Sequence, residues 1–535
     1  MSQEAKADKS SFEVDDEKNI AALPNQGFEG IDDKTLQYLP KDITPSELER
    51  ERALEEGETP SGTKKATVSD YFTLLASGFA LVSDGYQNNL STVFNPIFAL
   101  LYPHDYTSSV STRVSNALLV GEVIGQVVVG LICDRVGRKT AMVGTTLLIV
   151  IGGILCTAST APTPAGMFWM LTVARGTIGV GVGGEYPACS TSASDSANEK
   201  FGRDRGKIFI LVTNLMLSIG GPIVISLFLL IINGSHYHGG TTGSDRYKLQ
   251  YTWRVLFGIG IIIPLSVFYF RLKMMNPKLY RRNAIRHNPP YLLILKKYWK
   301  TLIGTAGTWF LYDFVTFPNG VFSSTIIASV TPDKGIVRTL EWNLLLSVLS
   351  LPGVFLGAWV VKYTGRRNLL IMGFMGYIVF GLIVGISYPK LTKVVPAFIV
   401  MYAMMQSSGN FGPGNMEGTI SAESYPTSIR GTCYGFSAAV GKAGAAIGTQ
   451  AFTPIRQHLG SRWTFIIAAC CGLAGVLLAF FFVEDKGKDR LEKEDEVWRQ
   501  YLVDHGYGDI QMGDGSAGAM SASGNREIEA LEFEK

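Results

Sequence analysis

Cysteine is scarce and unpatterned in this sequence. The 535 residues include six cysteines, with no Cys-x-x-Cys pair and no regular spacing, so the sequence predicts neither a zinc framework nor a disulfide scaffold. Charge is also limited: 17% of the residues are charged and 47% are hydrophobic, which excludes a disordered chain. The formal net charge of +3 argues against nucleic acid as a partner. No catalytic constellation is recognisable, so we expect neither an enzyme nor a cofactor.

The N-terminal segment predicts neither a cleaved secretory signal nor a mitochondrial transit peptide. Residues 1–70 have no basic region followed by an apolar one, and their acidity does not fit a transit peptide. They hold 17 acidic and 9 basic residues, which predicts a disordered tail. Residues 484–535, with 14 acidic and 7 basic residues, form a second acidic tail. Residues 71–483 have 14 acidic and 32 basic residues, so the near-neutral total is a cancellation of opposite charges.

Apolar runs of membrane-spanning length fill the middle of the chain. Each is close to the ~20 residues that cross the hydrocarbon core, where the backbone must be helical. The sequence therefore predicts an all-α membrane protein with twelve transmembrane helices, at 72–101, 114–133, 140–159, 166–188, 206–232, 252–271, 301–330, 342–361, 369–387, 395–416, 431–454 and 463–483. Pro96 and Pro318 predict breaks or kinks in the two longest runs.

The linker between the sixth and seventh spans is strongly basic. From Arg271 to Lys300 the sequence has nine Lys or Arg residues and no acidic residue, which predicts a cytoplasmic loop over 272–300. Counting spans outward from this loop places both termini in the cytoplasm. The same count places the glycosylation sequon at Asn233 outside the cell.

An internal repeat divides the chain. GLICDRVGRK recurs in degenerate form as VKYTGRRN, and Gly137 of the first copy matches Gly365 of the second. Asp84 and Asp313 are separated by almost the same interval as these two glycines. We therefore predict two six-helix halves, 71–271 and 301–483, related by a pseudo-twofold axis around a central cavity, which is the architecture of a transporter.

The first copy of the repeated motif predicts a cytoplasmic gate. Its charged residues follow one span and precede the next, where they can pair with neighbouring helix ends. We expect a tight turn rather than a binding site. The gate residues are Asp134, Arg135, Gly137 and Arg138.

Charged side chains inside the spans are the candidates for function, because each costs at least ~2.5 kcal/mol to insert. Asp313 lies mid-span among aromatic residues and Lys442 lies among glycines and alanines that leave room for an anion. Either can be a transport residue, or the two can form a structural ion pair. Both interpretations are compatible if protonation breaks the ion pair between Asp313 and Lys442. Asp84 is the repeat partner of Asp313.

Other charged or glycine-rich positions have several interpretations. Glu185 and Tyr186 end the run ARGTIGVGVGGEYP, which formally contains GxGxxG but follows no strand, so its glycines predict helix packing. Arg175 in this run suits a structural role. Glu122 and Glu417 can each be a proton site, a contact for a polar head group or a helix-end residue. The loop histidines favour a solvated loop over a metal site.

These motifs resemble the major facilitator superfamily over 71–483. GVGVGGEYP, Asp313 and the GKAG sequence around Lys442 are similar to its phosphate:proton symporter branch. Within that branch, the chain resembles the fungal glycerophosphoinositol permeases in the segments SGFALVSDGYQNN, MFWMLTVARG, TWFLYDFVTFPNGVFSSTI and RWTFIIAA.

The resemblance implies a proton-coupled importer of glycerophosphodiesters, working by alternating access in the fungal plasma membrane, and we expect a monomer. Its partners would be protons, the bilayer and a small anionic phosphodiester. Asp84, Glu185 and Asp313 match proton-path acids. Candidate substrate-binding residues are Lys442, Tyr186, Trp309, Asp313, Asn214, Asn415 and Glu417. Glu185 stands where phosphate symporters have aspartate, and Gly414 where they have asparagine; the smaller residue at Gly414 fits a bulkier ligand than phosphate.

Alternative functions remain at this stage. The substrate can be inorganic phosphate, or glycerophosphocholine, whose cationic head could use Glu417 or Glu122. A protein of another class, a transporter-like nutrient receptor that signals through its tails, is also compatible with the sequence.

Overall fold

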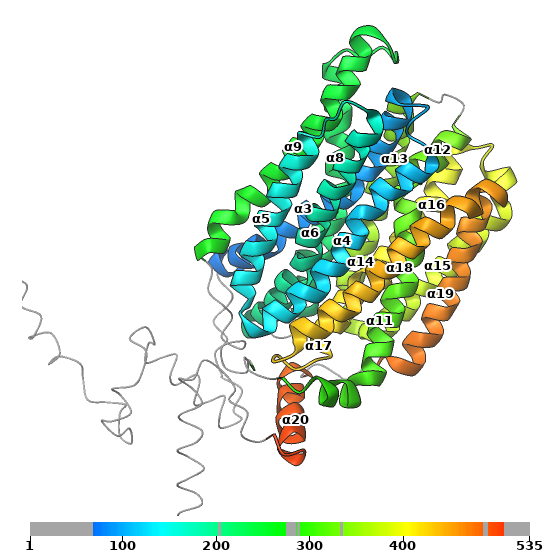
Figure 1. Cartoon of the computed structure of the whole chain (residues 1–535). Coiled ribbons are helices and arrows are strands. Elements are labelled where there is room, and N and C mark those ends of the chain that lie inside the picture. Colours follow the sequence, from blue (N-terminus) through cyan, green and yellow to red (C-terminus); the bar gives the residue numbers. More distant parts are fainter. Residues whose placement is uncertain are drawn as a thin grey trace, which may run out of the picture. The chain divides into compact units, whose positions relative to one another are not determined.

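The computed structural model describes residues 68–201, 205–273, 285, 289–331, 335–484 and 490–507. Within these ranges every regular element is a helix (Figure 1). The helices are α3 (Val68–Leu101), α4 (Ser108–Arg135), α5 (Arg138–Thr157), α6 (Pro164–Phe201), α7 (Arg205–Val212), α8 (Asn214–Gly234), α9 (Gly243–Lys273), α11 (Tyr291–Val321), α12 (Ser323–Val330), α13 (Ile336–Ser350), α14 (Pro352–Thr364), α15 (Arg366–Leu391), α16 (Val395–Gly409), the π-helix η2 (Asn410–Gly414), α17 (Asn415–Glu423), α18 (Arg430–His458), α19 (Arg462–Phe482) and α20 (Arg490–Asp504). Residues 1–67, most of the basic linker and residues 508–535 lie outside the described residues.

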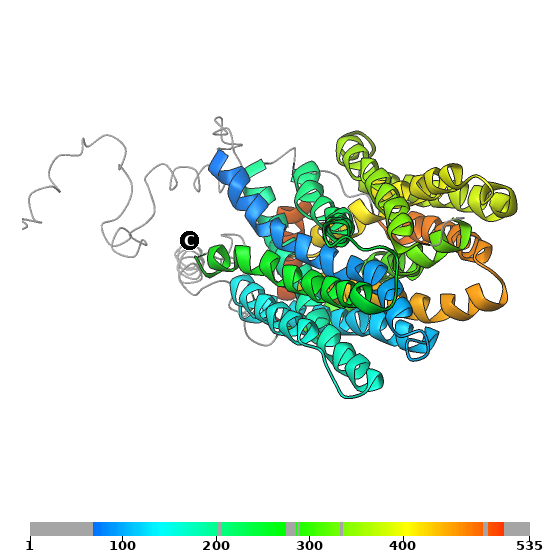
Figure 2. The ribbon, with the colours of Figure 1, turned by 90° about the horizontal axis from the view of Figure 1, so that it is seen from above.

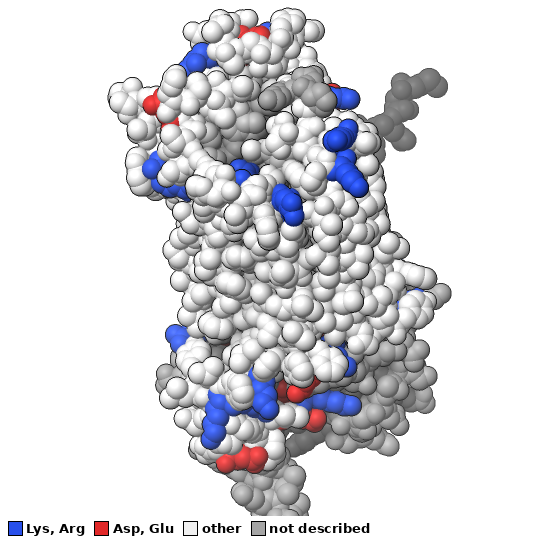
Figure 3. All heavy atoms as spheres, turned by 90° about the vertical axis from the view of Figure 1, so that its right-hand side faces the viewer, with Lys and Arg blue, Asp and Glu red and all other residues white. Residues whose placement is uncertain are grey.

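Helices occupy all twelve predicted spans, some of them as consecutive pairs such as α7 with α8. Eight of the spans are long and apolar enough to cross a membrane by composition. The remaining four contain the buried charged residues Asp84, Asp313, Glu417 and Lys442. On the face drawn in Figure 3, an uncharged band separates charged side chains at the two ends, as expected for a bundle that crosses a bilayer. The twelve-helix membrane fold is confirmed.

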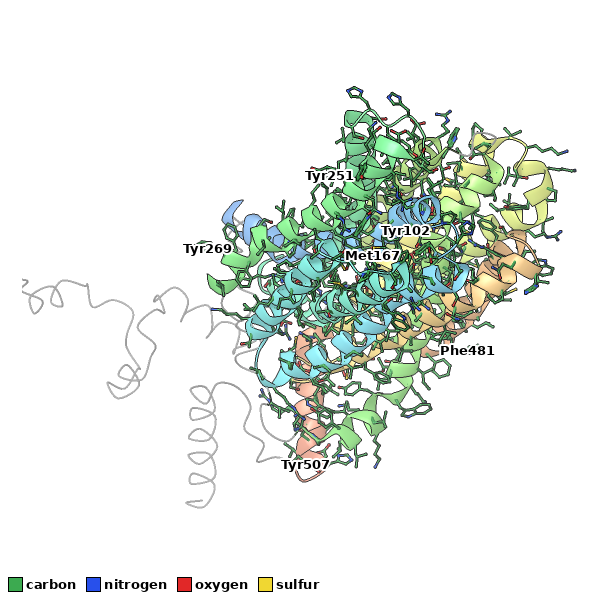
Figure 4. All side chains as sticks on the ribbon, turned by 45° about the horizontal axis from the view of Figure 1, so that its top comes forward. Tyr102, Met167, Tyr251, Tyr269, Phe481 and Tyr507 are labelled. Carbon is green, nitrogen blue, oxygen red and sulfur yellow. The ribbon has the colours of Figure 1, made fainter. Side chains whose placement is uncertain are left out.

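Aromatic side chains cover part of the outer surface of the bundle. Tyr251, Tyr269 and Phe481 project outward from α9 and α19 and are 63%, 58% and 70% exposed (Figure 4). Tyr102 lies further in: its hydroxyl accepts a hydrogen bond from Gln250 at 2.5 Å and lies 3.9 Å from the sulfur of Met167. Exposed rings of this kind suit a surface that contacts lipid and its interfaces.

Proline and glycine determine some of the helix breaks. α11 ends at Val321, three residues after Pro318, and Phe322 separates it from α12. In contrast, α3 continues through Pro96 as one helix, so the predicted irregularity does not interrupt it. Around Pro413 the chain forms the π-helix η2, because proline removes a backbone donor and disturbs the regular ladder, and then continues as α17.

The two largest hydrophobic clusters of the described residues build most of the core. The first draws on α3 to α9, with Phe94, Phe168 and Trp253 at its centre, and includes two residues of α13. The second draws on α11 to α19, with Phe374 and Phe465 among its members, and includes one residue of α7. In the view from above, the cyan helices and the yellow ones lie on opposite sides of the bundle (Figure 2). Each cluster follows one predicted half; the bounds of the halves stay a prediction.

A helix of the C-terminal tail, α20, packs against the bundle. Trp498 is 1% exposed and its ring lies 5.9 Å from that of Tyr298. The Tyr298 hydroxyl donates to Glu494 at 2.7 Å, and Asp495 accepts from the Thr427 backbone N–H and hydroxyl at 2.5 and 2.7 Å. These contacts explain why α11 begins at Tyr291, well before the predicted start of the seventh span at 301.

Candidate functional site

The ammonium group of Lys442 lies between two carboxylates. Lys442 is 2% exposed, and its Nζ is 3.0 Å from Oδ2 of Asp313 on α11 and 3.8 Å from Oε2 of Glu122 on α4. Glu122 belongs to the first predicted half, whereas Asp313 and Lys442 belong to the second. The lysine therefore joins the two halves near mid-span.

Aromatic rings complete the surroundings of Lys442. Its Nζ is 3.7 Å from the centre of the Phe317 ring and 5.2 Å from that of Tyr186, within cation–π range. Trp309 packs against the residue before the lysine: a Cβ added to Gly441 would lie 2.5 Å from its Cδ1 atom. The small residues of α18 thus let α11 approach closely enough to bring Asp313 and Trp309 to the lysine.

The charges of this cluster do not balance. One cation faces two carboxylates in a region that excludes water, and a buried carboxylate without a cationic partner is strongly disfavoured. A proton on one of the two carboxylates restores neutrality. The cluster can therefore hold a proton, and its ammonium group can bind an anion when a carboxylate is neutralised.

Asp84 and Glu185 lie beside a second buried cation, Arg271. Glu185 forms an ion pair with Arg271 of α9 at 2.5 Å, and Arg271 also donates to the Met142 carbonyl oxygen at 3.1 Å and to the Thr146 hydroxyl. Asp84 is fully buried beside Glu185. The sequence places Arg271 at the end of the sixth span and counts its charge with the basic linker; in the structure the residue is 3% exposed and lies inside the bundle.

Asn214 and Asn415 form a second contact between helices of the two predicted halves. The Asn214 amide of α8 donates to Oδ1 of Asn415 at 2.8 Å, and the Asn415 amide donates to the Val354 carbonyl oxygen at 3.1 Å. Asn214 and Lys442 occupy equivalent positions in the internal repeat, in the fifth span of each half. Glu417, two residues after Asn415, is 4% exposed, and its Oε1 has no hydrogen-bond partner among the described residues.

The predicted gate residues lie at the turn between α4 and α5 and contact the start of α18. Gly137 has φ 123°, which favours glycine, and makes this turn. Asp134 accepts the backbone N–H groups of Gly431 and Thr432 at 2.9 and 2.6 Å. Arg135 donates to the Tyr291 hydroxyl at 2.8 Å.

Asp195 of α6 holds two arginines at this end of the bundle. It pairs with Arg138 at the start of α5 and with Arg430 at the start of α18, and all three side chains are fully buried. The apolar run that predicts this span ends at residue 188, so Asp195 is not among the predicted functional residues. A polar serine-rich segment gives no apolar signal, although here it continues the helix to Phe201.

The other charged and glycine-rich positions have structural contacts. Arg175 donates to the Val114 carbonyl oxygen at 3.1 Å and to the Ser91 hydroxyl at 3.0 Å. A Cβ on Gly179 would lie 2.1 Å from the Leu118 carbonyl oxygen, so this glycine lets α6 and α4 meet. In the described part of the chain, no group of three His, Cys, Asp or Glu residues could hold a metal ion.

The comparisons with known proteins agree with this fold. The sugar (and other) transporter family matches residues 67–498. The chain belongs to this family. Glycerophosphoinositol permease 1 of Candida albicans is 51% identical over 445 residues, covering 82% of this chain and 83% of that protein. Glycerophosphoinositol transporter 1 of Saccharomyces cerevisiae is 48% identical over 447 residues, covering 83% of this chain and 85% of that protein.

A solved structure shows the same fold at low sequence identity. The major facilitator superfamily proton:xylose symporter XylE, bound to 6-bromo-6-deoxy-D-glucose, superimposes with a TM-score of 0.66. It is 16% identical, and the match covers 81% of this chain and 100% of that chain. The family match and the permease relatives confirm the resemblance of the sequence to the major facilitator superfamily, and this structure shows the same fold.

Proposed function

We propose that this transporter imports glycerophosphodiesters, glycerophosphoinositol in particular, together with protons by alternating access. The observation that carries the proposal is the buried Lys442, held 3.0 Å from Asp313 and 3.8 Å from Glu122. A phosphodiester brings one negative charge, and a buried ammonium group beside two carboxylates that can take up protons is a suitable partner for it. The family membership and the two permeases that are about half identical support this substrate class.

Proton coupling follows from the charges around the lysine. In the closed site, one proton shared by Asp313 and Glu122 balances Lys442. Entry of a phosphodiester adds a negative charge, which a second proton balances. We place this proton on Asp313, because a neutral Asp313 binds Lys442 more weakly than a charged one. The 3.0 Å ion pair is then weakened, and the Lys442 ammonium group is free for the substrate.

We assign the other residues to supporting roles. Asp84 and Glu185 pass protons toward Asp313. Tyr186, Trp309, Asn214, Asn415 and Glu417 line the substrate site with Lys442. Asp134, Arg135, Gly137 and Arg138 form the gate at the cytoplasmic end, which opens when the halves rock. The protein works as a monomer in the plasma membrane, with both termini in the cytoplasm and no bound cofactor.

Uptake in a fungal strain that lacks its own glycerophosphodiester permeases tests the proposal. Cells that express this chain should take up labelled glycerophosphoinositol saturably, and an uncoupler should abolish the uptake. Lys442→Ala should abolish uptake while the protein still reaches the membrane. The matched control is Lys393→Ala, because Lys393 is exposed. Wild-type uptake by Lys442→Ala, or no uptake by the wild-type chain, would overturn the assignment.

Glycerophosphocholine is a second candidate substrate. The buried Glu417, with an unpartnered carboxylate oxygen, favours it, since a quaternary ammonium head needs a nearby negative charge. Glu417→Gln should weaken uptake of glycerophosphocholine strongly and that of glycerophosphoinositol little. Competition with glycerophosphocholine, inositol and phosphate ranks the substrates directly.

A further inference from the structure

Gln126 is a buried amide without a partner. It lies on α4, is fully buried, and neither Oε1 nor Nε2 has a hydrogen-bond partner among the described residues. Native proteins rarely leave both ends of a buried amide unpaired, because each unpaired group keeps its full desolvation penalty. Such a group is expected where a ligand completes the hydrogen bonds.

The position of Gln126 relates it to the lysine site. It follows Glu122 by four residues, so the two side chains share one face of α4, about one helical turn apart. Glu122 is 3.8 Å from Lys442 on α18. The backbones of α4 and α18 touch at the level of Gln126, since a Cβ on Gly435 would lie 2.3 Å from its carbonyl oxygen. The amide thus borders the lysine site on its cytoplasmic side.

A second amide, with an unpartnered oxygen, lies on α3. The Asn88 side chain approaches the Glu122 carboxylate, and its Oδ1 is buried with no hydrogen-bond partner in the described chain. Its Nδ2 donates to the Asp84 carbonyl oxygen at 3.1 Å, which fixes the orientation of the side chain. Two amide groups therefore flank Glu122, both from the first predicted half.

The chemistry of these groups points to hydroxyl recognition. A primary amide donates and accepts without carrying charge, so it matches the paired donor and acceptor of a polyol rather than a phosphate or an ammonium group. We propose that Gln126, with Asn88, forms a subsite for the hydroxyl groups of the substrate's head while Lys442 holds the phosphodiester. The proposal rests on the proposed function, because it assigns one arm of that substrate.

The subsite would let the transporter discriminate between substrates with and without a hydroxylated head group. A site built to hydrogen-bond a hydroxyl group rejects analogues that lack it, because its own polar groups then stay buried and unpaired. Phosphate and short phosphomonoesters satisfy Lys442 but leave Gln126 unpaired. Gln126 of α4 would therefore make the transporter prefer a long, hydroxylated phosphodiester over phosphate.

The test compares two buried glutamines. Gln126→Met keeps the length and volume of the side chain but removes both hydrogen-bonding groups. Gln87→Met is the matched control, because Gln87 is equally buried on α3 but its amide donates away from the lysine site, to the Gly260 carbonyl oxygen of α9 at 3.4 Å. Membrane expression and thermal unfolding in detergent establish that both variants fold.

The measurements are the apparent KM for uptake of labelled glycerophosphoinositol and the inhibition constant of glycerol 3-phosphate as a competitor. Gln126→Met should raise the first by about tenfold, the loss of one or two neutral hydrogen bonds, and change the second less than about threefold. Gln87→Met should change neither. If Gln126→Met keeps the wild-type ratio, the subsite is overturned while the proposed function stands. If the wild-type chain takes up no glycerophosphoinositol, the proposed function itself fails.

Discussion

Asp195 and Glu423 occupy equivalent positions in the internal repeat, and each binds one arginine from its own predicted half and one from the other. Asp195 pairs with Arg138 and Arg430. Glu423 pairs with Arg366 at 2.6 Å and lies 3.5 Å from Arg205. The acidic residue near the end of α6 or α17 is thus bound to the first turn of a helix in the other half, so these pairs hold the two halves together at this end of the bundle.

Neutralising Asp195 should loosen that end of the bundle. Asp195→Asn leaves Arg138 and Arg430 without their carboxylate, which favours the open arrangement. Cys433, one turn after Arg430, is 3% exposed and reports on the opening. In a background with the other five cysteines replaced by serine, a membrane-impermeant maleimide applied to the cytoplasmic side should label Cys433 about tenfold faster, a shift of about 1.4 kcal/mol.

A distant ion pair controls for charge alone. Glu341→Gln removes the carboxylate that Arg338 binds at 2.7 Å, and both of these side chains are exposed. This variant should leave the labelling rate of Cys433 unchanged. Equal labelling of Cys433 in Asp195→Asn and in the unsubstituted background would show that Asp195 does not hold the gate.

The structure also separates what the sequence could predict from what it could not. The spans were predictable because lipid requires helices of a fixed apolar length, and the internal repeat was visible in Gly137 and Gly365. The ion pair between Lys442 and Asp313 was one of the interpretations of the sequence, since both residues are mid-span groups and their charges are opposite. The second partner, Glu122, was one of several unassigned acids, because the rotation of α4 about its axis depends on its packing against α6 and α18.

Buried polar segments were the main source of error. Arg271 stands directly after an apolar run, where a charge normally marks a loop, yet it turns inward to Glu185. Asp195 lies in a serine-rich stretch that resembles a loop by composition, yet it continues α6. Hydropathy reports only whether a segment is apolar, so helices that bury polar contacts at the ends of a bundle leave no such signal.

Removing Arg271 should destabilise the protein strongly. Arg271→Met leaves Glu185 buried without its cation, and breaking a buried pair in this way lowers the free energy of unfolding by about 3–5 kcal/mol. The double variant Arg271→Met with Glu185→Gln should regain most of this loss, because no uncompensated charge remains. Denaturant-induced unfolding in mixed micelles measures the free energy of unfolding of the single and the double variant. A single variant as stable as the wild type would mean that Glu185 is neutral in the folded protein.

Asp313 should set the coupling of substrate to protons. Since the proton enters from outside together with the substrate, wild-type uptake should fall as external pH rises. Asp313→Asn removes the titrating group but keeps a neutral side chain of the same size, so concentrative uptake should be lost. Exchange of labelled for unlabelled glycerophosphoinositol across liposomes needs no net proton movement, and it should persist.

The decisive result for Asp313 is the comparison of these two assays. Loss of both uptake and exchange would assign Asp313 to substrate binding instead of coupling. Concentration of substrate against a gradient by Asp313→Asn would exclude it from the proton path. Asp84→Asn, in the cluster with Glu185, provides the parallel measurement for the second buried acid.

The close approach of Trp309 to α18 should make Gly441 sensitive to the smallest substitution. A Cβ at Gly441 would lie 2.5 Å from Cδ1 of Trp309, and a rigid indole cannot move aside as a flexible side chain would. Gly441→Ala should therefore push α11 from α18, lower the free energy of unfolding by about 1–3 kcal/mol and raise the apparent substrate constant. Gly144→Ala is the control, since nothing lies within 4 Å of its added Cβ, and it should leave both unchanged. If Gly441→Ala transports and unfolds like the control, the indole does not fix the distance between α11 and α18 on which the Lys442 and Asp313 contact depends.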